Sequence, residues 1–425
     1  MKELFIRNRE KLFKNIPKNA MVFLFSASRK HRNGDQYFPF RQDSSFFYFT
    51  GINQHNSILV LFKDENQKCR TLLFIYNPTE KEIIYDGIFL SKEEARNISG
   101  IKEILFIDSF QKTWKDIMDK NPVVYSFLPD NNVFKDHLFF NGFYETLQKN
   151  FPVTEVRDIT PAILSLRMIK EPEEIAYMKK AIEITKSAFE KLFKNLKQGV
   201  AERELYSVLL FMYQKQLQTS YSFEPIVATG KNACTLHYKS NDTKLNSSDM
   251  LLVDTGAEYY NYAADITRTV PVSGKFSSKQ KFVYQEVLQT QKKAISLFVP
   301  GATISEINNQ VNTWMETVLI DIGLVTAKDI ENQSDDKPLL KKYYPHGVTH
   351  FIGLDVHDVG ENIPLQKGMV LTCEPGLYIP EWEIGIRIED NILIDGEKPQ
   401  ILSADIPKEI DEVERWIQQT REGMQ

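Results

Sequence analysis

Residues 250–271 read Met-Leu-Leu-Val-Asp-Thr-Gly-Ala-Glu-Tyr-Tyr-Asn-Tyr-Ala-Ala-Asp-Ile-Thr-Arg-Thr-Val-Pro, two β-type runs joined by a short polar and aromatic turn. Asp254 and Asp265 stand at the ends of these apolar runs, where a carboxylate is costly unless it is paired or bound to a metal. A turn centred on Tyr259 and Tyr260 would place both carboxylates opposite each other, roughly 5 Å apart at Cβ. Because like charges that close raise each other's pKa, the hairpin predicts a cation between them.

A cluster of histidines follows about eighty residues later. Three of the seven histidines, His346, His350 and His357, lie within residues 344–360, Tyr-Pro-His-Gly-Val-Thr-His-Phe-Ile-Gly-Leu-Asp-Val-His-Asp-Val-Gly. Any single one could be a core histidine satisfied by a backbone hydrogen bond. Three together, flanked by glycines that let backbone approach closely, favour metal binding or proton transfer.

The last β-type segments add two more carboxylates. Glu374 ends an apolar run, and the isoleucines of residues 386–394 alternate, which sends Arg387 and Glu389 to the opposite face. A salt bridge to a neighbouring strand is the alternative interpretation of Glu389. Four carboxylates with at least one histidine suit Mn, Co or Zn, and that many acidic ligands indicate two ions about 3.5 to 4 Å apart. Metal-assisted hydrolysis is the chemistry that such a site predicts.

Length and composition narrow the class of protein. A chain of 425 residues is expected to form two domains, or three, and its net charge of −5 does not indicate nucleic-acid binding. Three cysteines at wide spacings, Cys69, Cys234 and Cys373, argue against a disulfide framework and for a reducing compartment, so we expect a cytoplasmic protein. The sequence shows no hydrophobic signal core and no apolar run long enough for a membrane span.

The chain order predicts two domains with a boundary near residue 165. The first alternates helical and strand-like segments, which predicts an α/β domain. Its expected strands are residues 22–25, 46–49, 58–62, 71–75 and 104–107. The aromatic stretch at residues 35–51 is either core or the rim of an interface or cleft. In the second domain, Pro172 suits the first turn of a long helix, and periodicity predicts two further helices at residues 278–297 and 303–322.

These motifs together resemble aminopeptidase P, the Xaa-Pro aminopeptidase branch of the pita-bread metallopeptidases. The resemblance rests on Val253–Glu258, Ala264–Thr269, His346–Gly360, Thr372–Tyr378 and Gly385–Asp390, in family order. Residues 37–51 look like the N-terminal domain of the same enzymes. The resemblance implies an α/β N-terminal domain over residues 1–165 and an α+β pita-bread (creatinase/aminopeptidase-like) catalytic domain over residues 166–425.

Position by position, the resemblance also implies a site. The five metal ligands would be Asp254, Asp265, His350, Glu374 and Glu389, with Asp265 and Glu389 bridging two divalent ions, preferably Mn, with Co or Zn as alternatives. The catalytic residues would be Glu374, which would also handle the proton, His357, which would stabilise the oxyanion, and His237. Both histidines would also help to hold the substrate. His346, Tyr378 and Arg387 would lie on the substrate side. Cys373, Thr349 and Phe351 depart from the family pattern without removing a ligand.

The implied reaction is hydrolysis of the bond between an N-terminal residue and a following proline. A proline lacks an amide hydrogen and has a fixed φ, so a shaped pocket can select it. The implied partners are peptides with proline in second position and further copies of the chain, in a dimer or tetramer, with neither nucleic acid nor membrane. Prolidase, which cleaves Xaa-Pro dipeptides, and a non-catalytic binding protein of the same fold are the alternatives. Creatinase is excluded because it lacks the ligands present here.

Overall fold

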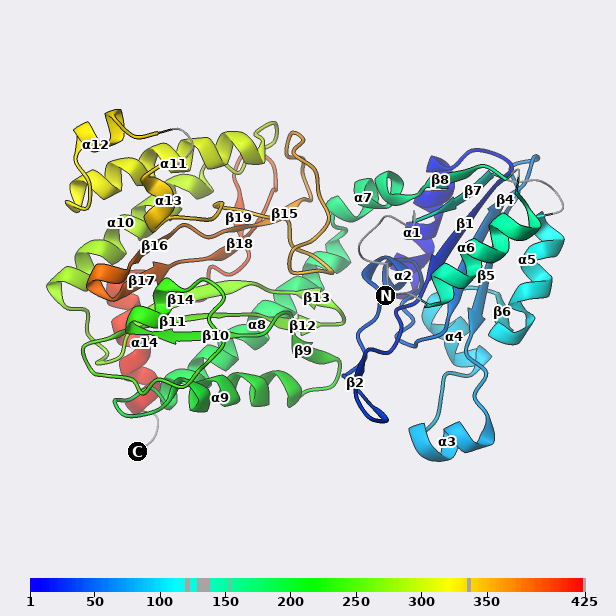
Figure 1. The fold of residues 1–425 in the computed structure, drawn as a ribbon, viewed down its shortest axis with the longest axis horizontal. Helices are drawn as coiled ribbons and strands as arrows, with labels where there is room; N and C mark the ends of the chain where they lie inside the picture. The colour runs from blue at the N-terminus through cyan, green and yellow to red at the C-terminus, as the bar shows by residue number, and fades with distance from the viewer. Residues whose placement is uncertain (119–122, 128–137, 153, 335–337, 423–425) are drawn as a thin grey trace. The chain divides into compact units, whose positions relative to one another are not determined.

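The computed structural model describes residues 1–118, 123–127, 138–152, 154–334 and 338–422. The chain forms two compact units, Met1–Arg167 and Met168–Gln425 (Figure 1). The first is an α/β unit and the second an α+β unit, which confirms the fold class expected from the sequence. No helix within the described residues is long and apolar enough to cross a membrane. All three cysteines are free thiols, and the cytoplasmic location expected from them stays a prediction.

A mixed six-stranded sheet forms the centre of the first unit. Its strands are β1 Ala20–Phe25, β4 Ile58–Lys63, β5 Cys69–Ile75, β6 Glu103–Phe106, β7 Val123–Ser126 and β8 Val156–Asp158, in the order β6-β5-β4-β1-β7-β8. The other elements are α1 Lys2–Asn15, the hairpin β2 His31–Asn33 and β3 Gln36–Tyr37, α2 Ser44–Thr50, α3 Glu80–Asp86, α4 Lys92–Ser99, η1 Ile107–Ser109, α5 Phe110–Met118, α6 Leu138–Asn150 and α7 Thr160–Met168.

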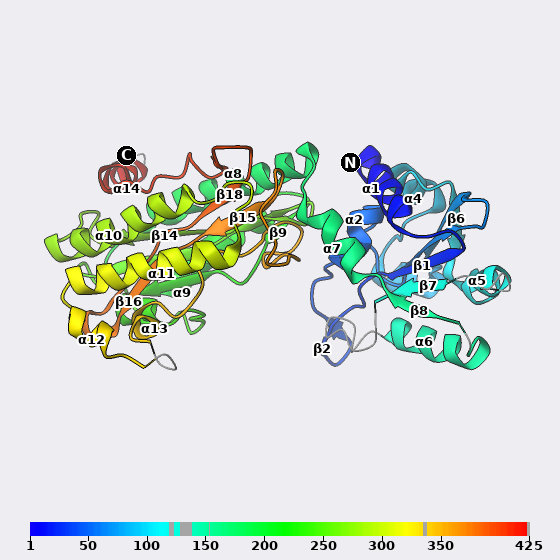
Figure 2. The same cartoon turned by 90° about the horizontal axis from the view of Figure 1, so that it is seen from above.

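Both faces of this sheet are covered. Figure 2 shows α1 and α4 on one face and α6 on the other. The ring of Phe23 on β1 packs against Phe110 and Trp114 of α5 and against Phe143 of α6, at centroid distances of 6.3, 6.2 and 4.5 Å. Burial on both faces explains why β1 is a continuous apolar run without alternation.

The strand predicted at residues 46–49 is wrong, because Ser44–Thr50 forms helix α2. Asp43 caps its N-terminus by accepting a hydrogen bond from the Phe46 backbone N–H, and Gly51 ends it in the left-handed region at φ 67°. The caps stabilise both ends of this short helix, and this stabilisation outweighs the β propensity of its aromatic residues.

The second unit consists of short antiparallel sheets flanked by long helices. The strands are β9 Thr219–Tyr221, β10 Ile226–Thr229, β11 Met250–Thr255, β12 Ala257–Tyr259, β13 Tyr262–Ala263, β14 Ile266–Pro271, β15 Val370–Cys373, β16 Gly376–Ile379, β17 Ile384–Arg387, β18 Asp390–Leu393 and β19 Gln400–Ile401. The helices are α8 Pro172–Lys194, α9 Glu202–Gln214, η2 Gly230–Cys234, α10 Ser278–Ile295, α11 Ile304–Asp321, α12 Ala327–Glu331, α13 Leu340–Tyr343, η3 Pro380–Trp382 and α14 Ile410–Glu422.

Two apolar cores determine which strand residues face the interior. One core joins β11 and β14 to α8, α9 and α14, and includes Val253 and Val270. The other joins β15, β17 and β18 to α10 and α11, and includes Leu371 and Ile386. Since side chains alternate along a strand, the burial of Val253 in the first core directs Asp254 to the opposite face.

The hairpin of β11 and β14 has a different register from the predicted one. Asp254 lies opposite Thr267, not opposite Asp265. The turn is centred on Tyr260 and Asn261, both at positive φ (48° and 65°), a conformation that two-residue hairpin turns require and that asparagine tolerates. The predicted turn, one residue earlier, is therefore wrong, and the pairing shifts by two positions. A shift of two keeps both carboxylates on one face of the hairpin.

Candidate active site

Four acidic side chains and one histidine from separate parts of the second unit meet in one cluster. They are Asp254 at the end of β11, Asp265 between β13 and β14, His350 in the loop before β15, Glu374 after β15 and Glu389 between β17 and β18. Ligand atoms of Asp265, His350 and Glu389 all lie within 4.8 Å of one another. His350 Nε2 lies 3.4 Å from Glu374 Oε1 and 3.5 Å from Asp265 Oδ2.

Local backbone geometry explains how Asp254 and Asp265 come together. Between them the chain passes Gly256, where an added Cβ would lie 1.7 Å from the Ala264 carbonyl oxygen. Only glycine allows the two strands to approach this closely. In the motif Asp-Thr-Gly at the end of β11, the aspartate thus supplies the carboxylate and the glycine allows the strands to pack.

Two buried carboxylate oxygens lack a hydrogen-bond partner. Asp254 Oδ1 and Glu389 Oε1 are both buried, and neither accepts a hydrogen bond. An unpaired carboxylate oxygen away from water is costly. A bound cation would satisfy such an oxygen, so the residues present fit a metal site.

The tautomer of His350 supports the same conclusion. Its Nδ1 lies 3.0 Å from the carbonyl oxygen of Phe351, which can only accept, so Nδ1 is assigned the hydrogen. In the neutral ring, Nε2 then directs a lone pair at the carboxylates of Asp265 and Glu374. Histidine ligands are commonly oriented in this way by a hydrogen bond from their other nitrogen. Oxygen ligands with one imidazole suit a divalent transition metal.

The carboxylates strongly perturb one another. Burial raises the pKa values of Asp265, Glu374 and Glu389, and neighbouring negative charges add to the shift in each. For Asp265 these neighbours are Asp254 and Glu374. Without a cation the cluster therefore resists full ionisation.

Arg387 connects the acidic cluster to the predicted substrate side. Its Nη2 donates to Asp254 Oδ2 at 2.5 Å, its Nε to Thr267 Oγ1 at 3.0 Å and its Nη1 to the Tyr378 hydroxyl at 2.7 Å. The alternative for Glu389, a salt bridge to a neighbouring strand, is not found among the described residues, where Glu389 accepts from Thr267 and Arg387 pairs with Asp254. As the alternation of isoleucines predicts, Arg387 and Glu389 share a face, and both contact Thr267 Oγ1.

The hydrogen bonds continue from Tyr378 to His346. His346 Nδ1 donates to the Gly347 carbonyl at 2.7 Å, so its Nε2 accepts from the Tyr378 hydroxyl at 2.8 Å. Burial and the charge of Arg387 lower the pKa of His346 to about 3. The ring is therefore neutral, and its 3.8 Å separation from Glu374 is not an ion pair. Burial raises the pKa of Tyr378 to about 12, so its hydroxyl keeps its hydrogen.

The remaining two predicted histidines are exposed. The ring of His357 packs edge to face against His350 at a centroid distance of 4.4 Å. Burial, and then the charges of His350 and His237, lower the pKa of His357. His237 follows η2 and also acts electrostatically on His346. All ten predicted site residues thus lie in or beside one cluster.

Sequence reasoning missed the residues that hold the cluster together. Thr267 donates to Glu389 Oε2 at 2.6 Å, and Thr372 donates to Glu374 Oε1 at 3.3 Å. The side chain of Asn391 forms hydrogen bonds with both backbone groups of Asp265. It donates to the carbonyl at 2.8 Å and accepts from the N–H at 3.2 Å. Thr267 was detectable, because period-two alternation from Asp265 places it on the same face.

This fold and this cluster define the class of the protein, a metal-dependent hydrolase with a pita-bread catalytic domain. Residues 176–396 match the model of Metallopeptidase family M24, and residues 5–125 match that of the Aminopeptidase P, N-terminal domain. The chain belongs to metallopeptidase family M24. The family implies divalent metal ions at the site.

Relatives match over nearly the whole chain. A Xaa-Pro aminopeptidase of Haemophilus influenzae is 36% identical, covering 98% of this chain and 97% of the relative. The human Xaa-Pro aminopeptidase 3 is 31% identical, covering 97% and 85%. A zinc-substituted aminopeptidase P of Escherichia coli, solved in complex with product, superposes with a TM-score of 0.89 at 30% identity, covering 99% of both chains.

We expect Asp265→Asn to stabilise the metal-free protein. The substitution removes a charge that is buried beside Asp254 and Glu374, and each pKa unit of such a shift corresponds to about 1.4 kcal/mol. Thermal unfolding in chelator should show a higher Tm than for the wild type. Mn²⁺ should then raise the Tm of the wild type but not of the variant. Asp405→Asn, at an exposed position, should match the wild type, and a lower Tm for Asp265→Asn in chelator would contradict this account.

Proposed function

We propose that this chain is a dinuclear metal-dependent aminopeptidase that hydrolyses the bond between an N-terminal residue and a following proline. The observation that carries the proposal is that one buried carboxylate oxygen on Asp254 and one on Glu389 have no hydrogen-bond partner, and that Glu389 lies beside Asp265 and His350. The relatives with this printed activity cover nearly the whole chain, and they do not favour a dipeptidase or a non-catalytic protein.

The proposed ligands are Asp254, Asp265, His350, Glu374 and Glu389. Two bound divalent ions would polarise the scissile carbonyl and lower the pKa of a water molecule. We prefer Mn²⁺ because four of the five ligands are carboxylates and one is an imidazole, a set richer in hard oxygen ligands than zinc sites usually are.

The chain's own residues then divide the remaining tasks. The side chain of Glu374 is 17% exposed, against 7% for Asp265 and 11% for Asp254, so it is the ligand best placed to take a proton from water and pass it to the leaving nitrogen. The exposed His357 beside His350 can donate a hydrogen bond to the developing oxyanion.

Arg387, Tyr378 and His346 fix the substrate side. Arg387 offsets the charge of Asp254, and its hydrogen bond to the Tyr378 hydroxyl orients that group toward neutral His346. Together with His237, these groups would hold the peptide so that its N-terminal amine lies near the carboxylates.

A peptide panel tests this function. With Mn²⁺, Co²⁺ or Zn²⁺ titrated in, we expect cleavage of Xaa-Pro-Xaa tripeptides with a kcat/KM at least about tenfold above that for Xaa-Pro dipeptides. Glu389→Ala should lose more than about 100-fold in kcat because a ligand is removed. Cleavage of dipeptides alone would make the chain a prolidase, and no cleavage with any of the three metals would favour a binding protein.

The variant His357→Ala tests whether His357 acts on the substrate or binds the metal. We expect kcat to fall by about 100-fold or more, since an oxyanion donor is removed, while metal content by elemental analysis stays at the wild-type value. His31→Ala, at an exposed position in the first unit, serves as the control and should keep full activity. Loss of metal from His357→Ala would show that its role is that of a ligand.

A homo-oligomer, dimer or tetramer, is part of the proposal. We group six exposed apolar residues of the first unit into one patch, because Arg29 contacts both the Tyr37 ring at 4.5 Å and Asp86 of α3 at 3.4 Å. Patches of this kind mark interaction sites. Its residues are Tyr37, Phe38, Ile83, Ile84, Tyr85 and Ile88, of which Ile88 is 94% exposed.

Substitution in this patch should dissociate the oligomer. We expect Ile84→Asp with Ile88→Asp to reduce the mass measured by light scattering to that of a monomer, because the charges oppose burial. Phe282→Asp, at a 48% exposed position on α10, should leave the mass unchanged. A monomeric wild type, or a double variant that keeps the oligomer mass, would contradict the proposal.

A further inference from the structure

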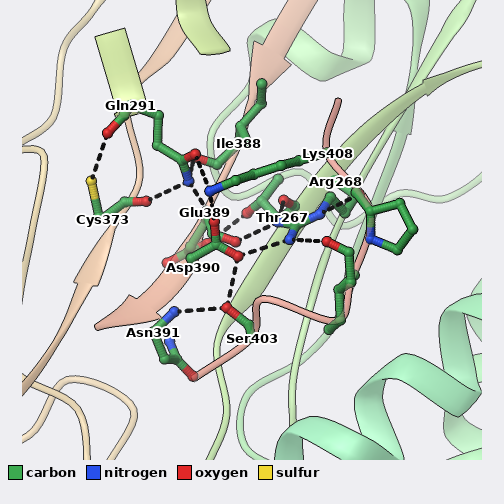
Figure 3. A network of polar contacts seen from close by, with 12 residues as sticks. Thr267, Arg268, Gln291, Cys373, Ile388, Glu389, Asp390, Asn391, Ser403 and Lys408 are labelled. Atoms are coloured by element: carbon green, nitrogen blue, oxygen red, sulfur yellow. Dashed lines mark hydrogen bonds and ion pairs between the residues drawn. The ribbon is translucent and has the colours of Figure 1, made fainter. Parts of the chain in front are cut away.

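A second buried polar cluster surrounds Asp390, the residue that follows Glu389 (Figure 3). At its centre, the carboxylate of Asp390 accepts four hydrogen bonds, from Arg268 Nη2 at 2.8 Å, Gln291 Nε2 at 2.9 Å, Ser403 Oγ at 2.7 Å and Lys408 Nζ at 2.6 Å. The side chains of Arg268 and Asp390 are fully buried, and that of Lys408 is 14% exposed. We call these five residues the Asp390 network.

Arg268 connects the network to Glu389. Its Nη1 donates to the backbone carbonyls of Thr267 at 2.9 Å and Glu389 at 2.6 Å. On the other face, Thr267 donates to the Glu389 carboxylate at 2.6 Å. Arg268 thus fixes the backbone of Glu389, while Thr267 fixes its side chain.

Ser403 connects the network to Asp265. Its Oγ accepts from the Asn391 backbone N–H at 3.2 Å. The Asn391 side chain donates to the Asp265 carbonyl at 2.8 Å and accepts from the Asp265 N–H at 3.2 Å. Asp265 and Glu389 are two of the three residues whose ligand atoms lie within 4.8 Å of one another. Both are therefore anchored to the same network.

The cations of the network exceed what charge balance requires. Asp390 carries one negative charge, and Arg268 alone would neutralise it. Lys408 adds a second buried cation from the segment after the last strand, and it also donates to Gln291 Oε1 at 2.9 Å. Arg268 reaches the same segment through the carbonyls of Ile406 and Pro407. Since burying a cation is costly, the second one needs a role beyond pairing with Asp390.

We propose that Lys408 is a positioning residue for the metal site, which it supports by fixing Asp390 and, through Arg268 and Ser403, the backbones that carry Glu389 and Asp265. The inference rests on the metal site of the proposed function. It assigns a role in the site to a segment that contributes no ligand. Residues that orient metal ligands typically change metal affinity or activity by 10 to 100-fold when they are substituted.

Metal affinity distinguishes this role from a purely structural one. The full-length protein is stripped of metal with a chelator, and its affinity for Mn²⁺ is measured by calorimetry. We expect Lys408→Met to weaken the Mn²⁺ Kd by about 10 to 100-fold. Lys408→Arg keeps the charge and should restore the affinity to within about threefold of the wild type.

Lys292→Met is the matched control. Lys292 pairs with Glu409, the residue after Lys408, at 2.6 Å and is 39% exposed. Its loss removes an ion pair from the same segment without touching Asp390, so the Kd should stay within about twofold of the wild type. An unchanged Kd in Lys408→Met, or an equal loss in Lys292→Met, would overturn the inference.

Two further results keep the test decisive. If Lys408→Met does not fold, Ser403→Ala is used instead, because it removes the hydrogen bond to Asp390 and the one accepted from the Asn391 N–H. It must weaken the Mn²⁺ Kd at least about threefold, and an unchanged Kd would overturn the inference. If the wild type itself binds no Mn²⁺, Co²⁺ or Zn²⁺, the proposed function fails. If the wild type binds and Lys408→Met binds equally well, only the present inference fails.

Discussion

The second unit depends on one electrostatic constraint, the crowding of four largely buried carboxylates. Arg387 offsets one of them and Thr267 and Thr372 satisfy single oxygens, yet Asp254 Oδ1 and Glu389 Oε1 remain without donors. Protein groups alone therefore do not neutralise the cluster. Bound cations are the remaining way to ionise all four groups at neutral pH, so metal binding and local stability are coupled.

The fold meets this constraint by giving each strand two different faces. The alternation that buries Val253 in an apolar core directs Asp254 to the site, and Glu389 and Asp390 divide in the same way between the site and the network behind it. The interior can tolerate these charges because the opposite face of each strand end is fixed, either by an apolar core or by the Asp390 network. Arg268 of the Asp390 network donates to backbone carbonyls, whereas Arg387 donates directly to the carboxylate of Asp254.

Much of this site was predictable because it depends on local pattern. Alternation predicted that Arg387 and Glu389 share a face, and costly carboxylates at strand ends predicted the partnership of Asp254 with Asp265. The hairpin register was not predictable in the same way, because the positive φ of Tyr260 and Asn261 decides it and a tyrosine gives little sign of that conformation. Helix α2 was missed because its caps at Asp43 and Gly51 outweigh the aromatic composition. The Asp390 network joins residues more than 120 positions apart, and no local pattern indicates such pairings.

The three clustered histidines show how partners, not spacing, decide a role. His346 and His350 each donate from Nδ1 to a nearby backbone carbonyl, which leaves Nε2 as the free lone pair in both. In His350 this nitrogen points at two carboxylates, an arrangement that a bound cation would stabilise. In His346 it accepts from Tyr378, so its lone pair is already used and the ring can only orient its neighbour. His357 packs on His350 yet stays exposed, which leaves its ring nitrogens accessible to a bound peptide. In the proposed function, the same residue type at short intervals would thus supply a ligand, a positioning group and a hydrogen-bond donor.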